Sequence, residues 1–149
     1  LSSNKNVDFI TSRDGSLVNL GNTELSFSPS VVAGNALVYQ PITNLEIALL
    51  SKFVGEQFMS NIESELSRLD SYFINDLNVN YTLRNVPFVR EILFSALVNN
   101  IFNVEYVNNG YFFTFDDDFS NPPAVTTVEG AGFFPQATIN FLVGATVKF

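Results

Sequence analysis

The most constraining feature of this sequence is a strict two-residue alternation that ends at its last residue. Every second residue from Ala137 to Phe149 is apolar, and the residues between them are mainly polar or small. Because side chains alternate between the two faces of a β-strand, this pattern predicts a strand with one apolar and one wetter face. Counted from Gln136, the alternation spans 14 residues. This length suits a tilted membrane-crossing strand better than a soluble strand of about five or six residues.

The same alternation recurs upstream. The clearest repeat runs from Ser71 to Arg84, and weaker ones cover Leu45–Phe53, Glu91–Asn99 and about Glu24–Tyr39, where Pro29 and Gly34 indicate a bend. The sequence therefore predicts an all-β fold, an antiparallel segment of a transmembrane β-barrel with about five long strands.

The connections between these segments alternate in length. Pro41–Asn44 and Arg84–Val89 are expected to be short turns, whereas Glu56–Asp70 and Asn103–Phe133 are expected to be long loops. Outer-membrane barrels have short periplasmic turns and long extracellular loops. In that arrangement the last strand ends in the periplasm, and its apolar set faces lipid: Ile139, Phe141, Val143, Ala145 and Val147.

Composition excludes several other classes of protein. Hydrophobic residues make up 46% of the chain and charged residues 15%, yet no apolar run approaches the roughly 20 residues of a membrane helix. The chain has neither Cys nor His, so disulfides, thiolate or imidazole metal sites and the commonest catalytic base are excluded. A net charge of −8 argues against nucleic-acid binding. We expect no enzyme activity, catalytic residue, metal or cofactor, and interpret Asp116, Asp117 and Asp118 as solvated loop residues.

Four short motifs then carry a family resemblance. The stretch Val98–Tyr106 resembles the N-L-F-N-x-x-Y signature near the end of TonB-dependent receptors, and Asn109–Tyr111 follows it. Phe134–Phe141 is similar to the family's Y-P-Q-A-G-R-N-F, although Thr138 and Ile139 replace its small and basic pair. Ser51–Phe58 and Leu69–Tyr72 resemble the preceding strands of Bacteroidetes receptors. The resemblance covers about Asn22–Phe149.

This resemblance implies that residues 1–149 are the C-terminal part of a 22-stranded barrel whose plug domain is absent from this chain. The implied function is energy-coupled uptake of a scarce large nutrient, such as a siderophore, a cobalamin or a glycan, across the outer membrane of a Gram-negative bacterium. The implied partners are the remaining barrel and plug, the TonB energy-transducing complex, the outer-membrane assembly machinery and the lipid bilayer. Because the chain begins at Leu1 without an export segment, we interpret it as a fragment or a processed product.

Two sets of residues are candidates for specific roles. Aromatic residues of the long Asn103–Phe133 loop are plausible ligand contacts, although they can also fold back onto the barrel rim: Tyr106, Tyr111, Phe112 and Phe113. The C-terminal Phe149 closes an alternating strand, so we interpret it as a signal for the assembly machinery or as an interfacial anchor.

Two alternatives share the alternation. A lipocalin-like barrel turns its apolar face inward around a ligand and requires eight strands. A soluble β-sandwich packs the apolar faces of two sheets together and favours short strands.

Overall fold

The computed structural model describes all 149 residues and contains strands and a single 3₁₀ turn, with no α-helix. No helical segment has the length and apolar character needed to cross a bilayer. The chain divides into two compact units. We call the first the sheet unit (Ala33–Phe53, Phe73–Glu105 and Ala137–Phe149) and the second the hairpin unit (Leu1–Val32, Val54–Tyr72 and Tyr106–Gln136).

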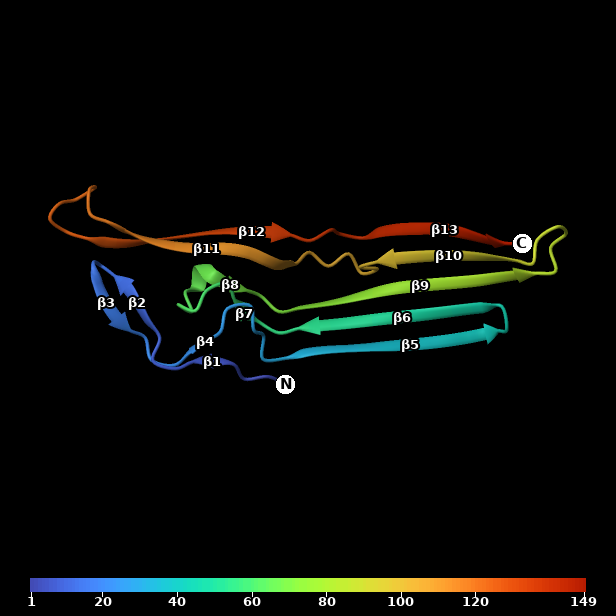
Figure 1. Ribbon diagram of the computed structural model, residues 1–149, viewed down its shortest axis with the longest axis horizontal. Coiled ribbons are helices and arrows are strands. Elements are labelled where there is room, and N and C mark those ends of the chain that lie inside the picture. Colours follow the sequence, from blue (N-terminus) through green and yellow to red (C-terminus); the bar gives the residue numbers. More distant parts are fainter. The chain divides into compact units, whose positions relative to one another are not determined.

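The sheet unit is built around one antiparallel sheet of five long strands in the order β13-β10-β9-β6-β5, which lie side by side in Figure 1. The strands are β5 (Val32–Ile42), β6 (Leu45–Val54), β9 (Tyr72–Arg84), β10 (Glu91–Asn99) and β13 (Asn140–Lys148). All five segments with sequence alternation thus enter the same sheet. The prediction of an all-β chain with about five long antiparallel strands is confirmed.

Some boundaries differ from those expected. β5 starts at Val32 rather than near Glu24, and it continues through Pro41, so the turn to β6 consists of Thr43 and Asn44 alone. β13 starts at Asn140, which leaves Ile139 just before the strand. Pro41 is compatible with its position because β5 is an edge strand, where a missing N–H is tolerated.

Strand register brings the apolar residues of β9, β10 and β13 to one face. Going across the three strands, the apolar rows are Leu83–Ile92–Val147, Tyr81–Phe94–Ala145, Val79–Ala96–Val143 and Leu77–Val98–Phe141. The opposite face carries the rows Arg84–Glu91–Lys148, Thr82–Leu93–Thr146, Asn80–Ser95–Gly144 and Asn78–Leu97–Leu142. A one-residue slip of any strand would move its whole apolar set to the other face. The fact that the apolar sets of β9, β10 and β13 fall on one face therefore supports this register.

The apolar face of this sheet is not buried. The fully buried residues of the sheet unit are the polar Asn75 and Asn100, whereas Phe141 is 73% and Val143 is 77% exposed. A soluble domain has the reverse arrangement, with apolar residues inside and polar residues outside. The sheet also has two unpaired edges, at β5 and β13, so it is open rather than closed on itself.

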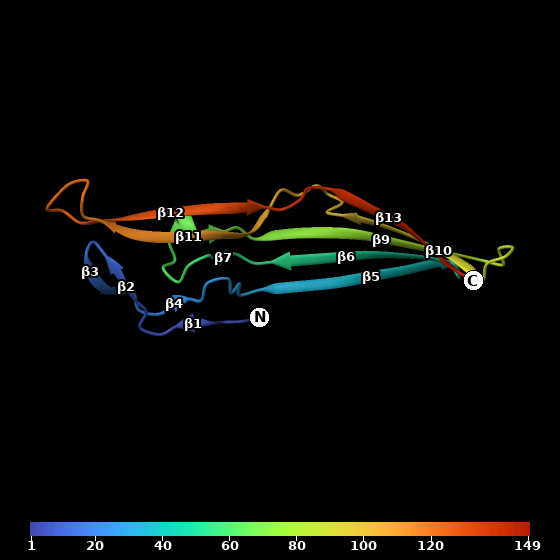
Figure 2. The same ribbon diagram turned by 45° about the horizontal axis from the view of Figure 1, so that its top comes forward.

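The hairpin unit has the only apolar core, formed by Val54, Met59, Leu69 and Tyr72. Its elements are β1 (Lys5–Asn6), β2 (Ile10–Arg13), β3 (Ser16–Asn19), β4 (Thr23–Glu24), β7 (Gln57–Phe58), η1 (Glu65–Ser67), β8 (Arg68–Leu69), β11 (Val107–Asp117) and β12 (Thr126–Pro135). They pair as four two-stranded antiparallel sheets, β1-β4, β2-β3, β7-β8 and β11-β12, and Figure 2 shows the last as a long hairpin.

Both long loops expected from the sequence therefore contain regular structure. The Glu56–Asp70 segment holds β7, η1 and β8, and it supplies the buried Met59 and Leu69. The Asn103–Phe133 segment holds β11 and almost all of β12. The two connections between sheet strands are long, as expected, but each contains strands that pair with each other and so satisfy their own backbone groups.

Candidate functional site

The β11–β12 hairpin carries a row of exposed aromatic rings. Tyr111, Phe113 and Phe115 are two residues apart on β11 and therefore share a face. Their ring centroids are 6.4 and 6.5 Å apart in sequence order, and neighbouring ring planes differ by only 15° and 14°. The three residues are 53%, 49% and 46% exposed. We call these three rings the aromatic strip.

Glycines on the partner strand let the strip lie flat. Tyr111 pairs with Gly132 and Phe113 with Gly130. A Cβ atom added to Gly132 would overlap the ring of Tyr111, and one added to Gly130 would overlap the ring of Phe113. Each of these rings therefore lies over glycine, where any larger residue would lift it.

The four aromatic candidates from the sequence separate into three environments. Tyr111 and Phe113 belong to the strip, and they lie in a strand rather than in a loop. Phe112 points to the opposite, less exposed face of β11. Tyr106 precedes the strand and packs against Tyr72, with ring centroids 4.4 Å apart and ring planes inclined by 31°. Burial and the neighbouring Tyr106 raise the pKa of the Tyr72 phenol, as expected for a packed pair.

Sequence reasoning missed two aromatic residues on the same face as the strip. Phe115 continues it, and Phe134 on β12 lies with its ring centroid 6.0 Å from that of Tyr111. The signal was present in the sequence as the alternation of aromatic residues at 111, 113 and 115 together with glycines at 130 and 132.

The acidic residues of the hairpin are engaged in local hydrogen bonds. Asp117 Oδ1 accepts from the backbone N–H groups of Phe119 and Ser120, at 3.1 and 3.0 Å. Hydrogen bonds from the Ser120 side chain and backbone, and from the Phe119 backbone, lower the pKa of Asp117. Glu129 accepts from Ser64 Oγ, and its other oxygen lies 3.8 Å from the Arg13 guanidinium.

Asp116 joins two hairpins that are far apart in sequence. Its Oδ1 accepts from Thr127 Oγ1 at 2.6 Å, and its Oδ2 accepts from Ser12 Oγ at 2.7 Å and from Gly15 N–H at 3.2 Å. Asp14 and Thr127 exchange two further bonds, of 2.7 and 2.8 Å. Asp14 and Gly15 both have positive φ, as a two-residue hairpin turn requires. Hydrogen bonds from Thr127 and then Ser12 lower the pKa of Asp116, because they favour the ionised carboxylate.

The motif that resembles N-L-F-N-x-x-Y has a structural explanation. Asn100 is 3% exposed and exchanges two hydrogen bonds with the backbone of Val104, of 2.8 and 2.9 Å. Its own N–H donates to Asp76 Oδ1 at 2.8 Å, and Asn103 Oδ1 accepts from Ile139 N–H at 3.0 Å. Asn100 and Asn103 both have positive φ, which Asn tolerates better than most residues. These asparagines shape the segment that follows β10.

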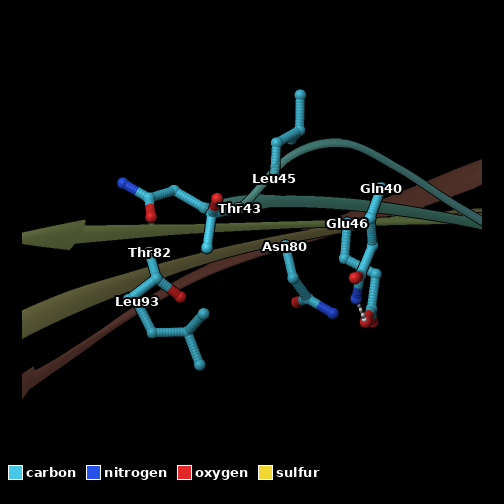
Figure 3. A pocket seen from close by; sticks show the side chains of 8 residues that line it. Gln40, Thr43, Leu45, Glu46, Asn80, Thr82 and Leu93 are labelled. Atoms are coloured by element: carbon cyan, nitrogen blue, oxygen red, sulfur yellow. Dashed lines mark hydrogen bonds between the residues drawn. The ribbon is translucent and has the colours of Figure 1, made fainter.

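The wetter face of the sheet contains a shallow hollow of about 230 Å³ near the β5–β6 turn. Its lining includes Glu46, Asn80, Thr82 and Leu93, and Gln40 Nε2 donates to Glu46 Oε2 at 2.8 Å. Figure 3 shows Gln40, Glu46, Asn80 and Leu93 on one side of the strands and Leu45 on the other. The hollow is open and mixed in character, and no cluster of acidic residues suited to a metal ion occurs here or elsewhere.

The lipid-facing candidates all lie on or beside the exposed apolar face. Phe141, Val143, Ala145 and Val147 occupy its outermost strand, and Ile139 precedes that strand with half of its side chain exposed. Phe149 follows β13 and is 91% exposed.

The sequence matches no protein-family model, no curated protein and no solved structure.

Proposed function

We propose that this chain is part of an outer-membrane β-barrel receptor for energy-coupled uptake of a large, scarce nutrient, such as a siderophore, a cobalamin or a glycan. The observation that carries the proposal is the uncovered apolar face of the five-stranded sheet, which lies opposite a more polar face. Soluble monomers rarely expose apolar patches of this extent, because water opposes them. In a barrel wall, the apolar face contacts lipid and the polar face lines the interior.

The dimensions of the apolar face agree with a bilayer. On β9 its residues extend from Phe73 to Leu83, ten residues apart, and the buried Asn75 is the one polar residue among them. At about 3.4 Å per residue this is about 34 Å along the strand, and a tilt of about 40° reduces it to a height of about 26 Å. The lipid-facing band of outer-membrane barrels is about 25 Å tall.

A charged row lies just beyond one end of this band. Lys148 Nζ is 2.5 Å from Glu91 Oε1, and Arg84 Nε is 4.0 Å from Glu91 Oε2. This row crosses β13, β10 and β9 at the end with the short β9–β10 turn. The row belongs to the polar face of the sheet, which lines the barrel interior in this proposal. We assign this end to the periplasmic side because the periplasmic turns of outer-membrane barrels are short.

The open edges fit the same proposal. An unpaired strand edge in lipid leaves backbone N–H and C=O groups unsatisfied, at several kcal/mol each. β5 and β13 therefore pair with strands from the remainder of the receptor, which also provides the plug and the segment that contacts the TonB complex. The chain has no enzymatic role in this arrangement.

The two alternatives are less compatible with the sheet. A lipocalin-like barrel needs a closed sheet of eight strands, whereas this sheet has five strands and two open edges. A β-sandwich needs a second sheet against the apolar face, and the sheet unit contains a single sheet.

Two neighbouring residues on β10 provide a matched test. Ala96 lies in an apolar row and Ser95 in a polar row, and residues 1–149 contain no native Cys. The variants Ala96→Cys and Ser95→Cys are made in the full-length receptor, labelled with an environment-sensitive fluorophore and reconstituted into vesicles that contain nitroxide-labelled phospholipid. We expect strong quenching for a label at Ala96 and weak quenching for one at Ser95. Equal quenching at both sites, or none at Ala96, would refute the barrel-wall proposal.

A further inference from the structure

The aromatic strip presents ring faces rather than ring edges to its surroundings. The rings of Tyr111 and Phe113 each lie over a glycine of β12, and the plane of Phe115 is nearly parallel to that of Phe113. One side of the strip is therefore covered by the hairpin backbone, and about half of each side chain remains exposed. Flat, open rings in a row suit ligands that stack, because apolar C–H and π surfaces then meet over their whole area.

The strip is electrically neutral although the hairpin is acidic. Between Val107 and Pro135 the charged residues are Asp116, Asp117, Asp118 and Glu129, with no Lys or Arg. Asp116 and Glu129 belong to the opposite face, where hydroxyl groups from Ser12 and Ser64 hydrogen-bond to them. Asp117, at the end of the strip, is bonded to the turn that follows it. The face that carries the strip therefore offers an anionic ligand no Lys or Arg of the hairpin, and Arg13 approaches the hairpin at Glu129, which belongs to the opposite face.

We propose that the aromatic strip binds a neutral oligosaccharide. A pyranose ring has an apolar C–H face that stacks on an aromatic ring and hydroxyl groups that bind polar side chains at the edges. The Tyr111 hydroxyl and the side chain of Asn109, which shares the face and lies opposite Phe134, provide such polar groups. Three rings spaced by 6.4 and 6.5 Å can contact more than one sugar, so a chain is favoured over a single sugar. This inference rests on the proposed function, because it names the class of nutrient that the receptor captures.

The experiment uses the purified full-length receptor in detergent, a printed array of neutral glycans and an anionic set of heparin fragments. The neutral glycan that gives the strongest signal is then titrated against the variants Phe113→Leu and Phe119→Ala. Leucine keeps an apolar side chain but removes the flat ring, whereas Phe119 is a 71% exposed aromatic residue outside the strip. We expect Phe113→Leu to weaken binding about tenfold, as for the loss of one stacking contact, and Phe119→Ala to leave it unchanged.

Several outcomes would overturn the inference. The inference is wrong if the receptor binds no neutral glycan, if it binds heparin fragments more strongly, or if Phe113→Leu and Phe119→Ala have equal effects. A fourth is a bilayer contact, in which a fluorophore on Phe115→Cys is quenched by nitroxide lipid. The Ala96 and Ser95 labels separate this inference from the proposed function. Lipid quenching at Ala96 with no glycan binding rejects the strip alone, whereas no quenching at Ala96 rejects the barrel wall even if glycan binds.

Discussion

Replacing Val143 by arginine places a charge near the middle of the apolar face. Val143 pairs with Ala96, which in turn pairs with Val79, so the new side chain has only apolar neighbours in its row. It also lies close to the centre of the alternation that runs from Ile139 to Phe149. In a barrel wall this position is near the bilayer midplane.

The expected cost follows from that position. Arginine on the lipid face at the midplane destabilises a barrel by about 2–4 kcal/mol, which lowers the folding equilibrium constant about 30- to 700-fold. Thr146→Arg places the same charge on the opposite face, in a row with Leu93 and Thr82, and should cost less than about 1 kcal/mol. Gly144→Arg is a second control at nearly the same depth as Val143, and no atom lies within 4 Å of its new Cβ.

The assay is reversible folding of the full-length receptor into lipid vesicles, measured as a function of urea concentration. Val143→Arg should shift the midpoint to lower urea, while both controls stay close to the wild type. If Val143→Arg and Thr146→Arg are equally destabilising, then the two faces do not differ in their surroundings and the assignment of lipid and lumen faces is wrong. If neither variant is destabilising, then this sheet is not in a bilayer.

Three further predictions concern the hairpin unit and the segment after β10. Asn100→Gly keeps a residue suited to positive φ but removes the buried side-chain hydrogen bonds, so we expect a loss of about 2–3 kcal/mol in the free energy of unfolding, measured by urea titration. Gly130→Ala should destabilise by at most about 1 kcal/mol in the same titration, because its Cβ overlaps the half-exposed ring of Phe113, which can move aside, whereas Gly144→Ala should be neutral. The lowered pKa of Asp116 means that its contribution to stability is present above the ordinary Asp pKa of about 4 and is lost as the pH falls through the lower folded value. The protection factors of the amide hydrogens in the Asp14–Gly15 turn, which correct for the intrinsic pH dependence of exchange, should therefore fall below about pH 4. Asp116→Asn should remove this acid-dependent change.

The five long strands were predictable because their signal is local. A strand with two different faces must alternate in sequence, and the sets on Ser71–Arg84 and Gln136–Phe149 do so almost without exception. The register adds what no single strand can show, namely that Val79, Ala96 and Val143 lie in one row. Boundaries were less accurate where Pro41 was read as part of a turn, although it lies within an edge strand.

The β11–β12 hairpin was not predicted because its pattern is ambiguous. Phe112 places an aromatic residue on the face opposite Tyr111, Phe113 and Phe115, so the three consecutive aromatic residues 111 to 113 obscure the alternation. Gly130 and Gly132 favour a loop interpretation when they are considered alone. Their role becomes visible only when each is paired with a ring across the hairpin, which is information about two segments rather than one.

The contacts of Asp116 depend on residues far away in the chain. Ser12 and Gly15 are separated from it by 104 and 101 positions, so no local pattern identifies them as partners. The sequence indicated a solvated loop for the acidic triplet, whereas Asp116 and Asp117 lie in β11. It also did not indicate that Asp116 joins the β2–β3 and β11–β12 hairpins. By contrast, the asparagines of Val98–Tyr106 were recognised as a motif, and only their role in shaping the backbone was missing.

Phe149 is the final residue to be tested, and two roles predict different results. It follows the edge strand β13, whose outer edge is unpaired, and its side chain is 91% exposed. An unpaired edge strand can add to the sheet of another protein, with main-chain bonds giving affinity and alternate side chains giving specificity. We therefore expect the assembly machinery to bind this strand and to recognise Phe149 together with Phe141, Val143 and Val147. The other role is an aromatic anchor at the periplasmic interface.

Deleting Phe149 from the full-length receptor separates these roles, because a recognition signal affects how much barrel is made and an anchor affects how stable the finished barrel is. We expect a lower amount of receptor in the outer membrane and more unfolded chain degraded in the periplasm, while assembled molecules keep a nearly normal melting temperature. Phe119→Ala, which also removes an exposed aromatic side chain but lies far from the terminus in sequence, is the matched control and should change neither quantity. A normal surface level combined with a clearly lower melting temperature would contradict the signal and leave the anchor as the role of this residue.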